Sequence, residues 1–358
     1  MIEVPRQWAS AVRAAAQSAR PLRIRGGGTK DFYGHVSDGE LFDTRAYTGI
    51  VDYEPSELVV TARCGTPLAE LEAELAARRQ MLAFEPPHFG ATATLGGMLA
   101  AGLSGPRRQA AGALRDFVLG VTILDGNGDV LSFGGQVMKN VAGYDVSRLM
   151  AGSLGTLGII LEASIKTQPV PVAQATLRFD LPEEKALDML NRWRGKPLPV
   201  SASVWHGGNL DVRLSGAVAA VKAAVASFGG ERVNDEQAAR FWTGIREHTT
   251  AFFQMDAPLW RLSLPAGLPA DAIGIGQHGG RLLEWGGALR WVAGPVDGHA
   301  LRDAVAKVGG HATLFRGADK SSGVFQPLPP ALMRIHRNIK AVFDPHGIFN
   351  VGRMYPGL

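Results

Sequence analysis

The sequence predicts an α+β protein with two main domains, on three observations. The chain has 358 residues, more than one small core usually organises. Its first half mixes short strands and helices with glycine-dense loops. Its second half contains a weak duplication, in which a β-hairpin and the helix after it occur twice. Two hairpins with covering helices are typical of an antiparallel sheet with helices on one face.

The first half predicts a helix, then short strands, then a second helix. Pro5 opens a helical pattern whose shared face consists of Trp8, Val12, Ala15 and Ala19. Short strands are expected at 22–25, 41–44, 50–53 and 58–63. Thr66 before Pro67 predicts a helix start, and the buried stripe of that helix consists of Leu68, Leu71 and Leu75.

A hairpin and a buried strand complete the first half. Residues 118–133 read as two apolar strands joined by G-N-G-D. The apolar run at 157–165 predicts a buried strand, and P-V-P at 169–171 ends it. We therefore predict a first domain over residues 1–172.

The duplication defines a second domain over residues 173–330. In one copy, 204–216 predicts a hairpin that leads into a helix ending at Gly229. In the other, 284–294 leads into a helix ending at Gly309. A further strand precedes each copy, at 175–180 and 259–264. Trp205 and Trp285 occupy equivalent places, and with Trp291 they are candidates for an exposed subunit interface.

The last segment, 331–358, predicts a helix and a tail that returns to the first domain. Leu332, Ile335, Ile339 and Val342 align along this helix. The tail F-D-P-H-G-I-F-N-V-G-R, at 343–353, contains glycine again.

Composition excludes several classes of protein. The net charge of +4 is spread without a dense basic run, so nucleic-acid binding is not expected. The single cysteine, Cys64, cannot form an intrachain disulfide or hold an iron–sulfur cluster. The N-terminus lacks the pattern of a signal peptide, and no apolar run is long enough to cross a membrane. We expect a cytoplasmic protein that reaches the inner membrane only through partners.

The 45 glycines gather in loops suited to a long phosphorylated ligand. The densest segments lie at 25–30, 90–108 and 138–160. Glycine lets backbone amides approach a ligand closely, and several such loops together favour a cofactor with many parts. FAD fits this description.

The first two segments predict a phosphate-binding site. After Arg25 come Gly26, Gly27 and Gly28, whose amides can form a nest for a pyrophosphate, with Thr29 beside them. A tight turn between strands is an equally simple interpretation. The second segment, P-P-H-F-G-A-T-A-T-L-G-G at 86–97, joins proline turns to small residues, although small residues also mark close helix packing. Its candidate residues, with those that follow, are Pro87, Gly90, Ala93, Thr94, Gly96, Gly97, Ser104 and Arg108.

The third segment places polar side chains beside G-S-L-G-T-L-G-I-I. Lys139 and Asn140 can stabilise the negative charge of a reduced flavin at its pyrimidine edge. Tyr144 can contribute, or it can be a core residue.

The order of these segments resembles the FAD-binding domain of the vanillyl-alcohol oxidase (PCMH-type) flavoprotein superfamily. Within it, four runs are similar to the FAD-binding E subunits of bacterial glycolate oxidases (glycolate dehydrogenases): R-G-G-G-T-K-D-F-Y-G, E-P-P-H-F-G-A-T-A-T-L-G-G, G-G-Q-V-M-K-N-V-A-G-Y-D and L-E-W-G-G-A-L-R-W. The similarity extends through both halves to the tail. It implies a two-part PCMH-type FAD-binding domain with an α+β antiparallel-sheet cap.

The resemblance also implies roles for single positions. Residues 25–29 and 90–97 would hold the pyrophosphate and ribityl chain, and Asn350 and Arg353 would lie near the flavin ring. The backbone of residues 155–159, including Gly155, Thr156, Gly158 and Ile159, would contact the adenine side. Members with covalent FAD often carry a histidine in the first loop, where this chain has Gly28 and Thr29, so we expect dissociable FAD.

No catalytic residue or metal ligand set stands out. The nine histidines form no H-x-H or H-x-x-x-H pair, unlike the histidine-rich cap cluster of the catalytic 2-hydroxy-acid dehydrogenases in this superfamily. G-I-G-Q-H-G at 274–279 matches a dinucleotide pattern but lacks the strand and helix that should flank it. Four cations on or after cap strands can bind a substrate carboxylate or line a solvated sheet edge: Arg261, Arg290, Arg316 and Lys320.

These observations predict an FAD-binding subunit of a multi-subunit glycolate (2-hydroxy acid) dehydrogenase. Its flavin would support electron transfer to an iron–sulfur partner, while a paralogous FAD-containing subunit oxidises the substrate. The alternatives are a stand-alone FAD-dependent 2-hydroxy acid oxidase, a non-catalytic scaffold without flavin, and a nicotinamide-dependent reductase.

Overall fold

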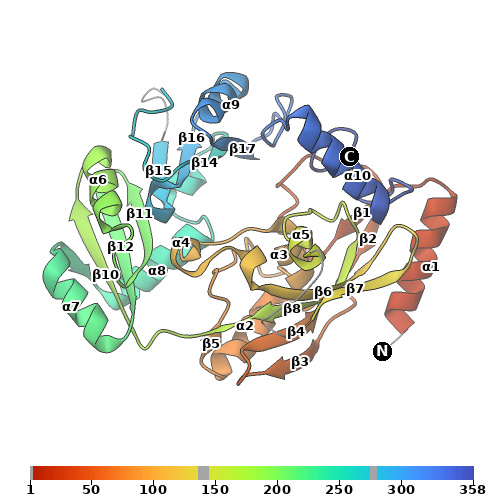
Figure 1. Cartoon of the computed structure of the whole chain (residues 1–358), viewed down its shortest axis with the longest axis horizontal. Coiled ribbons are helices and arrows are strands. Elements are labelled where there is room, and N and C mark those ends of the chain that lie inside the picture. Colours follow the sequence, from red (N-terminus) through yellow and green to blue (C-terminus); the bar gives the residue numbers. More distant parts are fainter. Residues whose placement is uncertain (1–2, 136–144, 275–279) are drawn as a thin grey trace.

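Two lobes, each organised around an antiparallel sheet, are visible in Figure 1, and the C-terminal helix returns to the lobe that contains the N-terminus. The computed structural model describes residues 3–135, 145–274 and 280–358. The predicted α+β class is confirmed. Lys139, Asn140 and Tyr144 lie outside the described residues, as does most of the 274–279 motif.

The first lobe contains a five-stranded sheet in the order β3-β4-β8-β6-β7, with every neighbouring pair antiparallel. Its strands are β3 (Ile50–Glu54), β4 (Val59–Arg63), β6 (Val118–Leu124), β7 (Val130–Gly134) and β8 (Ile159–Lys166). A separate parallel pair joins β1 (Leu22–Arg25) to β2 (Glu40–Asp43), and β5 (Gln80–Met81) pairs with β9 (Gln168–Pro169). The expected hairpin at 118–133 is confirmed as β6 and β7.

The helices that pack into the core of this lobe include α1 (Glu3–Gln17), α2 (Leu68–Ala77), α3 (Leu95–Ala101) and α5 (Val146–Met150). Helix α4 (Arg108–Ala111) has no buried residue and instead contacts the second lobe at residues 200–206. Leu68, Leu71 and Leu75 of α2 are fully buried. The helix predicted to start at Thr66 is present, but Thr66 does not cap it. Pro67 is the N-cap residue, and the Thr66 hydroxyl bonds to the backbone of Gly49.

The second lobe contains an eight-stranded sheet whose strand order mirrors itself, β13-β10-β12-β11 against β15-β16-β14-β17. The first half consists of β10 (Ala173–Asp180), β11 (Val200–His206), β12 (Asn209–Gly216) and β13 (Glu231–Val233). The second consists of β14 (Leu259–Ser263), β15 (Gly280–Glu284), β16 (Leu289–Ala293) and β17 (His311–Arg316). The two halves meet where β11 pairs with β15, over three residue pairs. The predicted duplication therefore organises the whole sheet.

Helices cover one face of this sheet, and the other face turns toward the first lobe. The covering helices are α6 (Glu183–Trp193), α7 (Val218–Phe228) and α9 (Gly298–Lys307), which pack on two separate apolar clusters. Helix α8 (Asp235–Arg246) packs in a third cluster together with first-lobe residues such as Leu103 and Leu154. Trp285 and Trp291 are buried, so the expectation that they form an exposed interface is wrong.

The last helix, α10 (Pro330–Phe343), brings the tail back beside β1. Ile348 accepts a hydrogen bond from the Leu22 amide at 2.7 Å, and Leu22 in turn accepts one from the Asn350 amide at 3.0 Å. Lys340 is buried and donates to the carbonyl oxygens of Thr156 and Phe349. The aligned residues Leu332, Ile335 and Val342 face solvent, whereas Phe343 is buried.

Polar contacts fix the lobes to each other. The Glu85 carboxylate pairs with Arg107 of its own lobe and with Arg213 of β12, the latter at 2.9 Å. The Trp285 indole donates to the carbonyl oxygen of Gly105. Lys320 donates to the carbonyl oxygens of Phe32 and Gly34. These contacts set the position of the second sheet over the segment that follows α3.

Candidate functional site

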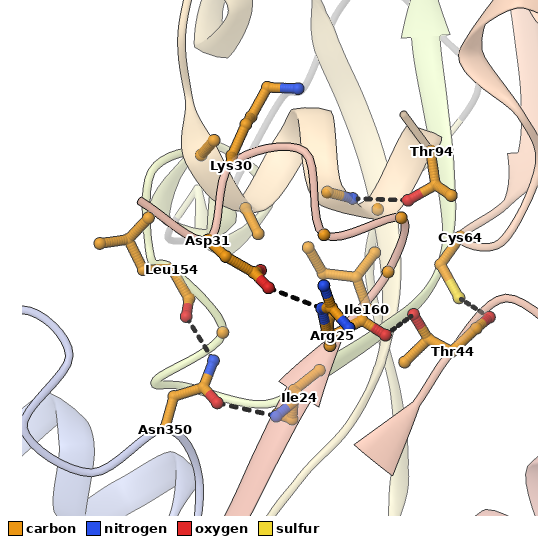
Figure 2. A pocket seen from close by; sticks show the side chains of 18 of the residues that line it. Ile24, Arg25, Lys30, Asp31, Thr44, Cys64, Thr94, Leu154, Ile160 and Asn350 are labelled. Atoms are coloured by element: carbon orange, nitrogen blue, oxygen red, sulfur yellow. Dashed lines mark hydrogen bonds and ion pairs between the residues drawn. The ribbon is translucent and has the colours of Figure 1, made fainter. Parts of the chain in front are cut away.

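The first cavity lies in the first lobe, where β1, α3, the 154–158 turn and the tail converge. It has a volume of about 720 Å³, part of it open to solvent. Figure 2 shows the 25–31 loop crossing it, with Thr94 and Cys64 on one side and Leu154 and Asn350 on the other. The structure thus brings parts of the first, second and third glycine segments and of the tail around one hollow.

The loop at 26–30 presents a run of free backbone amides. Within the described residues, the amides of Gly26, Gly27, Gly28, Thr29 and Lys30 donate no hydrogen bond. Successive unpaired amides in a turn form a nest that binds anions. Gly28 adopts φ +75°, and a Cβ atom on Gly27 would overlap the Thr92 carbonyl oxygen. Glycine is therefore required for this loop to lie against the second segment.

Charged side chains flank the loop. Arg25 pairs with Asp31 at 2.6 Å, so its guanidinium lies against the nest and is already partly neutralised. Lys30 donates to the His88 carbonyl oxygen at 3.1 Å. Burial lowers the pKa of Lys30 to about 8, and the Glu247 carboxylate opposes that shift. Lys30 therefore remains mostly cationic at neutral pH beside the anion nest.

The second segment forms the opposite wall through the start of α3. Thr94 is the N-cap residue, and its hydroxyl accepts a hydrogen bond from the Gly97 amide at 3.2 Å. A Cβ atom on Gly96 would lie 2.8 Å from Cβ of Cys64, so this helix packs closely on β4. Thr94, Gly96 and Gly97 line the cavity, and close helix packing, the simpler interpretation, holds at the same time.

The third segment and the tail close the cavity. Gly155 and Gly158 line it, and neither amide is hydrogen-bonded within the described chain. Asn350 accepts from the Ile24 amide at 2.8 Å and donates to the Leu154 carbonyl oxygen at 2.6 Å. Arg353 also lines the cavity, and its guanidinium donates to the Tyr33 carbonyl oxygen. These two tail side chains hold the wall together.

Other candidate residues lie away from this cavity. Ala93, Thr156 and Ile159 are buried next to lining residues. Pro87 and Ser104 line a second cavity, and Gly90 lines a third. The Arg108 guanidinium lies over the Trp285 ring, 4.4 Å from its centroid. The second segment therefore contributes to more than one site.

Several lining residues are not candidates from the sequence. Ile24, Thr44 and Cys64 lie outside the residues proposed from the sequence, and Ala100 and Leu154 lie within the second and third glycine segments but look like ordinary core residues there. Leu154 and Asn350 have positive φ, at 52° and 41°, which is uncommon outside glycine. Only the fold shows that these positions surround a ligand-sized space.

The second cavity lies between the segment 87–106 and the second lobe and has a volume of about 320 Å³. Its apolar wall is aromatic, from Phe89, Trp291 and Phe315. Its polar groups include Arg261 of β14, Glu284 at the end of β15, and His248 after α8. The third cavity shares Thr29 with the first and Phe89 and His248 with the second, so all three adjoin.

The polar groups of the second cavity have few partners. The Arg261 side chain makes no hydrogen bond or ion pair with any described residue. Its guanidinium lies 5.2 Å from the Trp285 ring centroid. Burial raises the pKa of Glu284 to about 7, although the Trp291 indole donates to this carboxyl at 2.8 Å and Arg261 is near. His248 stacks on Phe253, and its Nδ1 is buried without a partner. Burial lowers the pKa of His248 well below 6.5, so this imidazole is neutral.

The described residues contain no group of three or more His, Cys, Asp or Glu side chains placed to hold a metal ion. Among the same residues, no helix is long and apolar enough to cross a membrane.

Comparison with known proteins identifies the family of the chain and its FAD-binding domain. Residues 3–134 match the family described as FAD binding domain. The glycolate oxidase subunit GlcE of Escherichia coli (strain K12) is 45% identical over 97% of this chain and 96% of its own length. A D-lactate dehydrogenase of Archaeoglobus fulgidus is 32% identical over 53% of this chain and 43% of its own length. The glycolate oxidase subunit GlcD of Bacillus subtilis is 33% identical over 44% of this chain and 34% of its own length.

A solved structure of alkyldihydroxyacetonephosphate synthase shares the fold, with a TM-score of 0.69. It is 16% identical, and the match covers 96% of this chain and 74% of that one. FAD is the cofactor of this chain, and the residues present fit it. The nest of free amides suits a pyrophosphate, and the elongated wall from α3 to the tail suits a long molecule.

Proposed function

Because the chain belongs to the family of the glycolate oxidase subunit GlcE, we propose that it is the FAD-carrying subunit of a heteromeric glycolate (2-hydroxy acid) dehydrogenase. The observation that supports this most directly is the row of unpaired amides at 26–30 on the wall of the first cavity. We assign these amides to the pyrophosphate of FAD, and those of Gly155 and Gly158 to its adenine side.

The bound flavin supplies an acceptor that takes electrons from a substrate or partner and passes them on. The residues of this chain hold and shield it. Arg25 and Lys30 balance the phosphate charge, and Asn350 and Arg353 fix the tail across the cavity near the ring. Lys139 and Asn140, which lie outside the described residues, stay candidates for stabilising the charge of the reduced flavin.

We propose two partners, a paralogous FAD-containing subunit that oxidises glycolate and an iron–sulfur subunit that receives the electrons. One cysteine in 358 residues cannot supply a cluster, so the clusters must be held by another chain. The name of the Bacillus subtilis relative, glycolate oxidase subunit GlcD, denotes a subunit as well, which supports an assembly of related chains. We place the complex in the cytoplasm, on the inner membrane through its partners.

An anaerobic experiment tests this function. The purified chain is reconstituted with FAD, then mixed with glycolate alone and again with the partner subunits present, while flavin absorbance is followed. We expect one dissociable FAD per chain and bleaching only when the partners are present.

Bleaching of the isolated chain by glycolate would identify a stand-alone 2-hydroxy acid oxidase instead. Bleaching by a reduced nicotinamide would indicate a reductase. A protein that takes up no FAD would be a scaffold, and the proposal would fail.

A further inference from the structure

Arg261 differs from the other cations that the sequence offers for a carboxylate. Arg290 donates to the carbonyl oxygens of Leu268 and Pro269, and Arg316 donates to that of Phe253. Lys320 is occupied by Phe32 and Gly34. Those three side chains fix loops or lobes in place. Arg261 has a place on the cavity wall and no hydrogen-bond partner among the described residues.

No ion pair within the described residues neutralises the Arg261 guanidinium, although the Glu284 carboxyl lies near it. The only carboxyl that lines this cavity is Glu284, and no ion pair joins it to Arg261 within the described residues. A close ion pair would lower the pKa of this carboxyl, whereas burial raises it. Arg108 approaches the same Trp285 ring and also has no anionic partner there. A half-buried guanidinium without a counter-ion is a ready binding group for an anion.

The walls define the size and kind of that anion. Phe89, Trp291 and Phe315 form the apolar part of the wall, and polar groups form the rest. The volume of about 320 Å³ includes space open to solvent, so only a small ligand fits between these walls. The planar guanidinium matches a carboxylate through two parallel hydrogen bonds. Backbone strain marks the same wall, because Phe89 and His248 both have a φ of 54°. Such conformations cluster where a site is held in shape.

We propose that this cavity is a carboxylate-binding site of the chain itself, in which Arg261 holds a small 2-hydroxy acid between the lobes. The site adjoins the FAD cavity through the third cavity, which Thr29, Phe89 and His248 line. The choice of a 2-hydroxy acid rests on the proposed function, whereas the site as an anion site rests on Arg261 and the walls.

Binding to the FAD-loaded full chain tests the proposal. Trp291 lines the cavity and the Trp285 ring centroid lies 5.2 Å from the Arg261 guanidinium, so tryptophan fluorescence, together with calorimetry, reports binding of glycolate, acetate and the neutral analogue glycolamide. We expect glycolate to bind, acetate to bind more weakly, and glycolamide not to bind. R261M should weaken glycolate binding roughly 10- to 100-fold, the loss expected for a charge-assisted pair, and R261K should restore part of it.

The matched control is R240M, since Arg240 is exposed on α8, pairs with Glu236 and does not line the cavity. FAD content and melting temperature show whether each variant folds. Equal glycolate affinity of R261M and the wild-type chain would overturn the proposal. So would a change of flavin absorbance in R261M with carboxylate affinity intact, because Arg261 would then face the flavin.

The experiments distinguish failure of the carboxylate site from failure of the proposed FAD-dependent function. A chain that holds FAD and is reduced through its partners, but binds no carboxylate, would refute this site and leave the proposed function standing. A chain that binds carboxylate through Arg261 but takes up no FAD would do the reverse.

Discussion

The first and second cavities are built from opposite materials. Backbone amides and small side chains line the first, at Gly26, Gly27, Gly96 and Gly155. Large aromatic rings and a few ionisable groups line the second, among them Trp291, Arg261 and Glu284. A backbone-built site depends on where glycine permits close approach, whereas a side-chain-built site depends on which charges are left without partners. The two therefore respond to different substitutions.

The largest effect is expected at the first cavity, from G27A. A Cβ atom there overlaps the Thr92 carbonyl oxygen, and a backbone group cannot move aside as a flexible side chain can. We expect a loss of about 4 kcal/mol or more in unfolding free energy, together with loss of FAD. Chemical denaturation and flavin absorbance measure both.

The control for G27A is G267A, where an added Cβ meets open space. Equal stability and equal FAD content in G27A, G267A and the wild-type chain would show that the first cavity does not depend on close backbone approach.

A smaller and pH-dependent effect is expected at the second cavity, from E284Q. Glu284 is fully buried, with Arg261 and Trp291 facing it and Glu85 more distant, held by Arg107 and Arg213. Its pKa is raised from 4.5 to about 7, so the folded state keeps a proton that the unfolded state releases. Stability from this group is present below pH 4.5 and is lost as the pH rises through 7, on the order of 3 kcal/mol in total.

In E284Q the fall in unfolding free energy between pH 5 and pH 8 should therefore be smaller by most of that amount, with FAD content unchanged. E236Q, on the exposed face of α8, is the control. Parallel pH profiles for E284Q and the wild-type chain would mean that Glu284 ionises freely, and the contrast between the cavities would weaken.

The smallest effect is expected from T94A, which removes the hydroxyl that accepts from the Gly97 amide. Loss of an N-cap costs about 1 kcal/mol, and T94S should restore it. Because Thr94 lines the cavity, FAD affinity should fall modestly in T94A, as measured by titration of the apoprotein. An unchanged unfolding free energy in T94A would show that the start of α3 does not need this cap.

Sequence reasoning reached the first cavity because its signals are local. Gly26 to Gly28 follow a strand directly, and Thr94 stands just before Gly96 and Gly97, so composition and order suffice. The duplication in the second lobe is also predictable, since turn and helix recur in each copy, whereas the mirrored order of the strands is visible only in the structure. The sequence does not show that Thr66 leaves α2 uncapped, because its hydroxyl partner is Gly49, 17 residues earlier, which a local pattern cannot reveal.

The second cavity could not be read from sequence for a related reason. Arg261 and Glu284 are 23 residues apart in the sequence. They line the same cavity because β14 and β15 both pair with the strand between them, β16. His248 follows a helix and resembles any surface histidine until Phe253 stacks on it. Trp285 and Trp291 look like exposed interface residues in the sequence, but Trp285 is buried against Gly105 and Arg108 of the first lobe and Trp291 among His248, Phe253 and Phe315. In each case the role of the side chain depends on tertiary neighbours that are distant in the sequence.

The mirrored order of the eight strands has a consequence for solubility. Where β11 meets β15, each half ends in a strand whose amide and carbonyl row is satisfied only by the other half. Without the other half, either half would expose an unpaired edge strand, which can pair with strands of other molecules and cause aggregation. Joining both copies in one polypeptide conceals the two edges at once and protects each from aggregation.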